Sequence, residues 1–312
     1  MRFRPGELTV VLGGNRSGKT QLCRSIAGLD AIRDGLITLD GNDITHAPVG
    51  VRPVAMVYQA FINYPSFTVS QNLRAPLRHQ RNRKRHHERL SRAEVDARVL
   101  EVARTLQIED LLERFPHELS GGQQQRVAIG RAMISNTRVI LLDEPLVNLD
   151  YKLREALSTE LRELLVRENN IVVYTTTDPK EAFQLADTVM LMANHEVLQQ
   201  GAPLDVYLQP DSFAAADLMS DPAVNPIEGG AIRPEHLRLE RRGANDRVFA
   251  ASLLAVETNG SETFAHCSVS GEHWLARLDG LPDIKPGQKL ILYASESDLL
   301  MFPSAAPSAV SG

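Results

Sequence analysis

The chain has 312 residues, 43% of them hydrophobic, so it can bury a sizeable core in one large or two smaller domains. Its formal net charge of -5 argues against a general affinity for nucleic acid, and its two cysteines, Cys23 and Cys267, argue against a disulfide framework and fit a reducing compartment. The opening residues are too short and interrupted for a signal peptide, and no apolar run approaches a bilayer-spanning length, so we expect a soluble chain that can still dock on a membrane.

A glycine-rich loop follows the first predicted strand, ELTVVL, and precedes a helix predicted over residues 21–27. The loop fits G-x-x-x-x-G-K-[ST], in which glycines allow backbone N–H groups and a helix N-terminus to surround phosphate. We predict a nucleotide site in which Lys19 reaches the terminal phosphates and Thr20 ligates Mg²⁺. The loop residues are Gly13, Gly14, Asn15, Arg16, Ser17, Gly18, Lys19 and Thr20.

Residues 78–92 form a basic run without interleaved aromatic side chains, which argues against stacking on nucleic-acid bases. Two interpretations stay open: a solvated loop, or a contact with anionic lipid headgroups. The adjacent His86 and His87 lack the spacing of a metal-binding pair, so no metal is predicted there.

A Ser-Gly-Gly turn at residues 120–122 precedes a predicted helix and is a second anion-binding device. A chain with one phosphate loop has no obvious use for both devices in one site. The alternative is an ordinary helix start with a flexible glycine turn. The residues concerned are Ser120, Gly121, Gly122 and Gln123.

Two later strands also end in polar residues. The apolar run over residues 139–142 ends in Asp143 and Glu144, and we predict Asp143 in the Mg²⁺ shell and Glu144 polarising the attacking water. A solvated strand end would look the same, but together with the phosphate loop the pair indicates nucleotide hydrolysis. The strand beginning at residue 171 ends in three threonines and Asp178, before a helix predicted to open at Pro179.

The alternation of apolar runs with helical segments predicts an α/β domain over residues 1–222, with a parallel sheet covered by helices. Short strands separated by turns then predict a small β-barrel or sandwich over residues 223–303, with Cys267 and Trp274 in its core. Residues 304–312 are predicted to be a frayed tail.

LSGGQ, the phosphate loop and LLDEP together resemble the ATP-binding-cassette ATPases, the motor subunits of ABC transporters, over about residues 7–219. The resemblance implies a P-loop NTPase cassette with a helical subdomain at about residues 65–135. It also implies that Gln59 senses Mg²⁺ and communicates with the membrane partner, and that Asp150 lies in the loop that crosses a dimer interface.

Several partners follow from the same resemblance. Two cassettes of this family enclose two ATP molecules head to tail, so the phosphate loop of one chain faces the LSGGQ of the other. We therefore expect ATP and Mg²⁺ as cofactors, and a second cassette, two transmembrane permease subunits and, indirectly, an external solute-binding protein as partners. We expect no nucleic acid partner. The expected location is peripheral, on the cytoplasmic face of the cell membrane.

Narrower features point to one branch of the family. The segment GGAIRPEHLRL resembles the start of the OB-like regulatory domain on carbohydrate-importer ATPases of the maltose and glycerol-3-phosphate type. QAFINYP, TVSQNLRAPLR and LVNLDYKLREAL resemble the paired ATPases of glycerol importers. The implied cargo is a sugar, a polyol or a glycerol-phosphate-type solute, which the other subunits select.

Three features depart from the family pattern. About 25 residues that carry two edge strands and an adenine-stacking aromatic side chain have no counterpart before the RPGE segment. Arg16 stands where sugar-importer cassettes usually carry glycine, and its side chain either crowds the phosphate or points to solvent. Thr177 stands where the family has a histidine that contacts the γ-phosphate and holds the attacking water.

The loss of this histidine predicts slow hydrolysis at the chain's own phosphate loop, because one transition-state donor contributes about 3–4 kcal/mol. We therefore expect a second, different cassette that keeps the histidine. A non-hydrolysing regulatory or structural cassette is one alternative. A soluble cassette ATPase unconnected with transport is another, although such proteins usually have tandem cassettes or a long coiled coil, and neither is present here.

Overall fold

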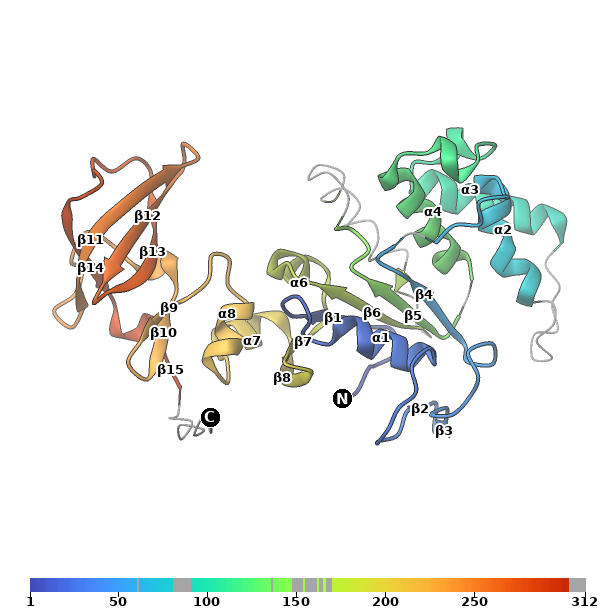
Figure 1. The fold of residues 1–312 in the computed structure, drawn as a ribbon, viewed down its shortest axis with the longest axis horizontal. Coiled ribbons are helices and arrows are strands. Elements are labelled where there is room, and N and C mark those ends of the chain that lie inside the picture. The colour runs from blue at the N-terminus through green and yellow to red at the C-terminus, as the bar shows by residue number, and fades with distance from the viewer. Residues whose placement is uncertain are drawn as a thin grey trace. The chain divides into compact units, whose positions relative to one another are not determined.

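The computed structural model describes residues 1–60, 62–80, 91–135, 137–147, 154, 162, 165–166 and 170–302. The chain divides into two compact units, Met1–Pro203 and Leu204–Gly312, whose elements are labelled in Figure 1. Within the described residues, no helix combines the length and the apolar character that crossing a bilayer requires.

The first unit is built on a six-stranded sheet with the order β4-β5-β6-β1-β7-β8. The first five strands are parallel, and β8 runs antiparallel to β7. The strands β1, β5 and β6 are buried along their whole length, which explains their unbroken apolar sequences. The strands are β1 (Leu8–Leu12), β4 (Val54–Val57), β5 (Val139–Asp143), β6 (Ile171–Thr176), β7 (Thr188–Ala193) and β8 (Glu196–Gly201).

The helices α1 (Lys19–Ala27) and α6 (Pro179–Leu185) pack directly on this sheet. The helix α1 buries Cys23 and Ala27 in a cluster with side chains of β1, β5, β6 and β7. The helix α6 begins at the proline, after Asp178 caps it, and packs against β1 and β6. A separate two-stranded sheet consists of β2 (Thr38–Leu39) and β3 (Asn42–Asp43).

A group of three helices packs together beside the sheet (Figure 1): α2 (Val69–Gln80), α3 (Arg92–Thr105) and α4 (Gly121–Ile134). Short 3₁₀ helices, Glu109–Leu111 and Pro116–Glu118, lie between α3 and α4. Capping boxes begin both α3 and α4, so the start of each helix is fixed by a local side-chain signal.

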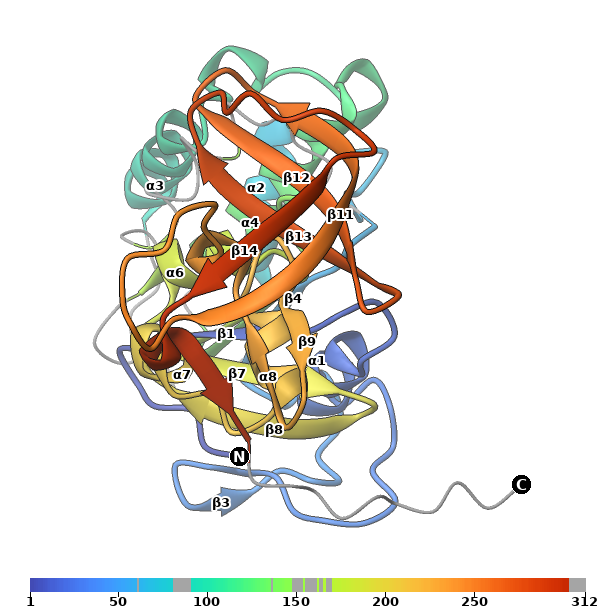
Figure 2. The ribbon, with the colours of Figure 1, turned by 90° about the vertical axis from the view of Figure 1, so that its left-hand side faces the viewer.

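The second unit consists of two helices and two antiparallel sheets, with the strand orders β13-β12-β11-β14 and β15-β10-β9. Figure 2 shows β11 bending along its length, and its pairing with β12 is irregular between Leu253 and Ala255. Its elements are α7 (Pro203–Leu208), α8 (Phe213–Leu218), β9 (Asn225–Ile227), β10 (Gly230–Ile232), a 3₁₀ helix (Pro234–His236), β11 (Arg247–Thr258), β12 (Glu262–Val269), β13 (Glu272–Asp279), β14 (Lys289–Ala294), a 3₁₀ helix (Glu296–Asp298) and β15 (Leu299–Met301).

The core of this unit lies between its sheets and includes Cys267 and Trp274, as predicted. The boundary between the units follows Pro203. It lies earlier in the chain than residue 222, the predicted end of the first domain. The helices α7 and α8 group with the second unit because α8 packs on β10 and Ala216 shares a small core with Val224 and Ala231.

Candidate functional site

The parallel strands of the first unit bring several polar residues to one edge of the sheet. The phosphate loop follows β1, and Gln59 lies two residues after the end of β4. Glu144 and Thr177 come directly after β5 and β6, respectively. Neighbouring strands are in register near these ends, since Leu12 pairs with Thr176 and Asp143 pairs with Thr175. The carboxyl end of such a sheet is where open α/β folds bind ligands.

The phosphate loop needs glycine where its backbone turns tightly. A Cβ on Gly13 would lie 2.3 Å from the carbonyl oxygen of Met192, and Gly18 has a φ of 103° as it caps α1. Arg16 also has a positive φ, 63°, and is exposed, so it takes up a conformation that glycine adopts without strain. Of the two alternatives for Arg16, the exposed side chain favours the one in which it points to solvent.

Lys19 is buried inside the loop, with only 4% of its surface exposed. Its Nζ atom donates to the carbonyl oxygens of Gly13 and Gly14 at 2.7 and 2.9 Å, and lies 3.4 Å from Oε1 of Glu144. The ammonium group is therefore held at the mouth of the loop, beside a predicted catalytic carboxylate.

The two predicted carboxylates have different partners. Oδ1 of Asp143 accepts hydrogen bonds from the hydroxyls of Thr20, at 3.1 Å, and Thr175, at 2.8 Å. The Oε2 atom of Glu144 accepts a bond from Nε2 of Gln59 at 3.1 Å. The structure thus brings together Lys19, Thr20, Gln59, Asp143 and Glu144, which are far apart in the sequence.

Thr175 has a role that the sequence did not reveal. In addition to its bond to Asp143, its hydroxyl accepts a hydrogen bond from the backbone N–H of Glu144 at 3.0 Å. Glu144 has a φ of 48°, an uncommon conformation for a residue with a side chain. One buried hydroxyl therefore holds both carboxylate residues. The three threonines are visible in the sequence, but only the pairing of β5 with β6 identifies this one.

The other two threonines differ from Thr175 in their surroundings. The hydroxyl of Thr176 accepts a hydrogen bond from the backbone N–H of Asp178 at 3.0 Å. Thr177 is exposed at the junction of β6 and α6, and in the described part of the chain its hydroxyl makes no hydrogen bond. Among the described residues, the hydroxyl at the predicted switch position therefore has no hydrogen-bond partner.

A buried pair connects β6 to α6 below this junction. The hydroxyl of Tyr174 donates to Oε2 of Glu181 at 2.8 Å. Burial raises the pKa of both groups. This pair, together with the cap that Asp178 forms on α6, fixes the backbone on both sides of Thr177.

Ser120 and Gln123 form the capping box of α4. Oγ of Ser120 accepts from the N–H of Gln123 at 3.3 Å, and Oε1 of Gln123 accepts from the N–H of Ser120 at 3.0 Å. Ser120 and Gly121 are exposed. Within the described residues, neither hydrogen bond nor ion pair joins this helix start to the phosphate loop. Asp150, the predicted dimer-loop residue, lies outside the described residues.

The donor set fits a nucleotide with a hard divalent cation. Thr20, Asp143 and Gln59 contribute hydroxyl, carboxylate and amide oxygens, the ligand type that Mg²⁺ prefers. Among the described residues, the buried hydroxyl of Ser17 has no hydrogen-bond partner, so it can donate to a ligand in the phosphate loop. Cys23 lies below the loop, and burial raises the pKa of its thiol well above the usual range, so it is a core residue rather than a nucleophile.

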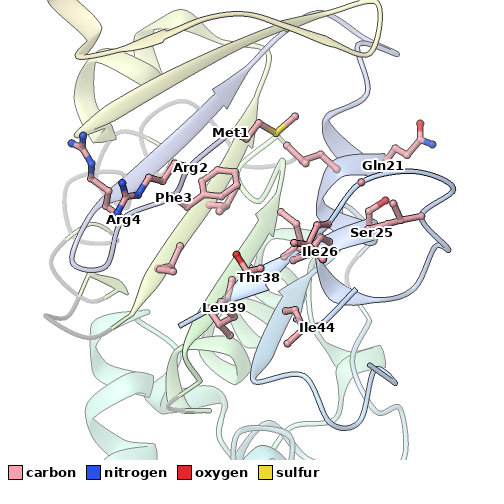
Figure 3. A pocket seen from close by; sticks show the side chains of 18 of the residues that line it. Met1, Arg2, Phe3, Arg4, Gln21, Ser25, Ile26, Thr38, Leu39 and Ile44 are labelled. Atoms are coloured by element: carbon pink, nitrogen blue, oxygen red, sulfur yellow. The ribbon is translucent and has the colours of Figure 1, made fainter. Parts of the chain in front are cut away.

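A cavity of about 800 Å³ opens beside α1, but it contains none of the catalytic groups. Figure 3 shows the ring of Phe3 and the side chains of Ile26 and Leu39 around the same space. The cavity meets the phosphate loop at Gly18, next to His195. It is an apolar recess adjacent to the site and not the place of the chemistry.

A second cavity, of about 610 Å³, lies close to Gln59. It is lined by β4, by Tyr58, Ile62 and Tyr64, and by residues of α2 and α4. Ile62 and Tyr64 are 56% and 40% exposed, and the guanidinium of Arg131 lies 4.3 Å from the centre of the Tyr64 ring. This groove lies between β4 of the sheet and the helices α2 and α4. Tyr58, which lines it, directly precedes Gln59, the residue that contacts Glu144.

Comparison with known families divides the sequence in a similar way. Residues 1–147 match the family model described as ABC transporter, and residues 230–302 match the model of the TOBE domain. The second match covers most of the C-terminal sheets.

Curated relatives are similar along most of the chain. An uncharacterized ABC transporter ATP-binding protein, y4oS, of Sinorhizobium fredii is 36% identical over 93% of this chain and 84% of its own length. The sn-glycerol-3-phosphate import ATP-binding protein UgpC 2 of Rhizobium johnstonii is 36% identical over 85% of this chain and 80% of its own. UgpC 3 of Agrobacterium fabrum is 33% identical over 98% and 92%, respectively.

Solved structures agree with this relationship. The ATP-binding cassette MJ0796, in a dimeric post-hydrolysis state bound to ADP and Pi, superposes with a TM-score of 0.58 and 28% identity, over 65% of this chain and 88% of its own. The chain thus shares the fold of this ATP-binding cassette. The chain belongs to the family of ABC transporter ATP-binding subunits, which are ATPases.

Proposed function

We propose that this chain is the ATP-hydrolysing subunit of an ABC importer for glycerol-3-phosphate or a related polyol or sugar. The single observation that carries the activity is the convergence of Lys19, Thr20, Gln59, Asp143 and Glu144 at one sheet edge. The solute class is supported by the names of relatives that are sn-glycerol-3-phosphate import proteins.

Each residue has a defined task in this proposal. Backbone N–H groups of the phosphate loop and the ammonium of Lys19 bind the phosphates, and Thr20, Asp143 and Gln59 would hold Mg²⁺. Bound Mg²⁺ would neutralise charge that develops on the phosphate oxygens. Glu144, fixed by Thr175 and Gln59, accepts a hydrogen bond from the attacking water and orients it.

The chain's own site is proposed to hydrolyse ATP slowly. A threonine hydroxyl at position 177 is shorter than an imidazole and does not titrate near neutral pH, so one transition-state contact is weakened. Removal of such a donor typically lowers the rate by a factor of about 10²–10³. The proposed partner is a second, different cassette that keeps a histidine there.

The exposed start of α4 suits this heterodimer. Ser120, Gly121, Gly122 and Gln123 would complete the partner's ATP site, because a helix N-terminus with exposed N–H groups attracts anions. Asp150 is proposed to lie in the loop that crosses the same interface. The working hydrolytic site would then combine the partner's phosphate loop with this chain's α4.

Two permease subunits are the proposed membrane partners, on the cytoplasmic face of the cell membrane. The groove beside Gln59 is the proposed contact, since it exposes Ile62 and Tyr64 and lies next to a residue that touches Glu144. An external solute-binding protein would contact the permeases and not this chain. The C-terminal all-β unit is proposed to be regulatory.

A non-hydrolysing cassette is the second candidate, and Thr177 is the observation that favours it. Both candidates require the chain to bind ATP, which is tested by measuring ATP binding to the purified chain with and without Mg²⁺. Lys19→Ala is expected to abolish binding. Glu144→Gln should leave binding intact. If Lys19→Ala bound ATP as well as the wild type, the proposed site would be wrong.

The asymmetry that both candidates share is tested in the complex co-purified with the partner cassette and permeases. Glu144→Gln here and the equivalent change in the partner should differ, with loss of transport only in the partner variant. Equal loss in both would show that this chain's own site turns over as fast as the partner's.

A further inference from the structure

Two histidines of the C-terminal unit lie against each other on the outer face of the β12–β13 hairpin. Nδ1 of His266 is 3.3 Å from Nε2 of His273, and their ring centroids are 5.4 Å apart. In the hairpin register His273 pairs with Ser268, two residues after His266 on the same face. The pair is thus set by strand pairing, and neither residue takes part in the proposed ATP chemistry.

The distance between the two nitrogens allows both to bind the same transition-metal ion. With metal–nitrogen bonds of about 2.0–2.1 Å, nitrogens 3.3 Å apart subtend about 105–110° at the metal, close to the tetrahedral angle. A hydrogen bond between two neutral imidazoles also gives this distance. In the hydrogen-bonded form one of the two nitrogens carries a proton and has no free lone pair, so metal binding requires that ring to adopt its other neutral tautomer.

A third side chain lies against the other nitrogen of His266. Oε1 of Glu257, on β11, is 3.5 Å from Nε2 of His266, and among the described residues this buried nitrogen has no hydrogen-bond partner. A carboxylate that accepts a hydrogen bond from the far nitrogen of a ligating histidine fixes the tautomer that leaves the near nitrogen free to bind metal. Glu257 lies on the side of His266 where such a carboxylate acts, and His273 lies at the other nitrogen.

We infer that His266 and His273 chelate a divalent transition-metal ion of the class that prefers imidazole, such as Zn²⁺, Ni²⁺ or Cu²⁺. No group of three or more His, Cys, Asp and Glu side chains that could hold a metal ion occurs within the described residues, so water completes the coordination. His273 is exposed, which gives the ion direct access. A bound ion would tie β12 to β13 through their side chains.

The test is calorimetric titration of the full-length, tag-free chain with ZnCl₂, without nucleotide. We expect one binding step that is lost in His266→Gln and in His273→Gln. His236→Gln is the matched control: it alters another histidine of the same unit, whose Nδ1 faces the carbonyl oxygen of Asp298, and should bind Zn²⁺ like the wild type. A second control, His86→Asn with His87→Asn, excludes the basic run as the source of the signal.

Two further measurements keep the test independent of folding defects. Glu257→Gln leaves both ligands in place and should weaken Zn²⁺ binding by up to about tenfold, the lower end of the range for such outer partners, because Glu257 is largely exposed. Zn²⁺ should also raise the midpoint of thermal unfolding of the wild type, and not of His273→Gln. Zn²⁺ binding that persists unchanged in His266→Gln and His273→Gln, or its absence from the wild type, would overturn the inference.

Discussion

Thr175 is the residue whose replacement most directly tests how the two carboxylates are positioned. Thr175→Val keeps the shape of the side chain but removes the donor to Asp143 and the acceptor for the N–H of Glu144. An unsatisfied buried N–H costs about 1–3 kcal/mol, so we expect a lower midpoint of thermal unfolding. ATPase activity of the complex should fall further than ATP affinity, because Glu144 loses its fixed orientation.

Thr175→Ser serves as the control because it keeps the hydroxyl. It should retain activity, and it should lose only the small amount of stability that comes from removing one buried methyl group. ATP dissociation constants and steady-state ATPase rates of the wild type and the two variants distinguish an effect on ATP binding from an effect on hydrolysis. Equal rates for the valine and serine variants would mean that the hydroxyl does not position Glu144.

The residue scale also shows where prediction from sequence stops. The phosphate loop can be predicted because it fits a specific motif after an apolar run, and Asp143 and Glu144, which are ambiguous alone, become informative in the same chain as that loop. Thr175 is not, because its role depends on which strand lies beside β6 and in which register. The His266–His273 pair was missed for the same reason, since it exists only through the β12–β13 pairing.

At the scale of elements, the junction of β6 and α6 depends on the buried bond between Tyr174 and Glu181. Because burial raises the pKa of Glu181 in the folded chain, its contribution to stability is complete below its unfolded pKa and is lost as the pH rises through the folded pKa. Glu181→Gln keeps an acceptor for Tyr174 but does not titrate. Its unfolding midpoint should therefore rise relative to the wild type as the pH increases from about 4.5 towards 7.

The comparison variant is Glu181→Ala, which leaves the Tyr174 hydroxyl buried without an acceptor and should be about 1–3 kcal/mol less stable than Glu181→Gln at every pH. Thermal melts of the three proteins across this pH range give the answer. A constant difference between Glu181→Gln and the wild type would contradict the raised pKa.

Element boundaries were predictable where local signals are strong. The capping box at Ser120 and the proline that opens α6 mark helix starts in the sequence itself. The grouping of α7 and α8 with the second unit was not predictable, because it depends on packing of α8 against β10, a contact between segments with no common sequence pattern.

At the scale of the whole molecule, the account describes one half of an asymmetric motor. We propose that its phosphate loop binds ATP, that its exposed α4 start completes the ATP site of a second cassette, and that Thr177 slows hydrolysis at its own site. The predicted membership of the ABC transporter family is confirmed by the family match and the relatives. The proposed asymmetry rests on one side chain, so it is open to a direct test.

That test is the single-turnover rate of ATP hydrolysis by the purified chain and by its Thr177→His variant, at saturating ATP and Mg²⁺. The account predicts that both bind ATP with similar affinity, that the wild type hydrolyses it slowly, and that Thr177→His is faster by up to about 10²–10³-fold. Brisk, cooperative hydrolysis by the wild-type chain alone, unchanged by the histidine, would contradict it.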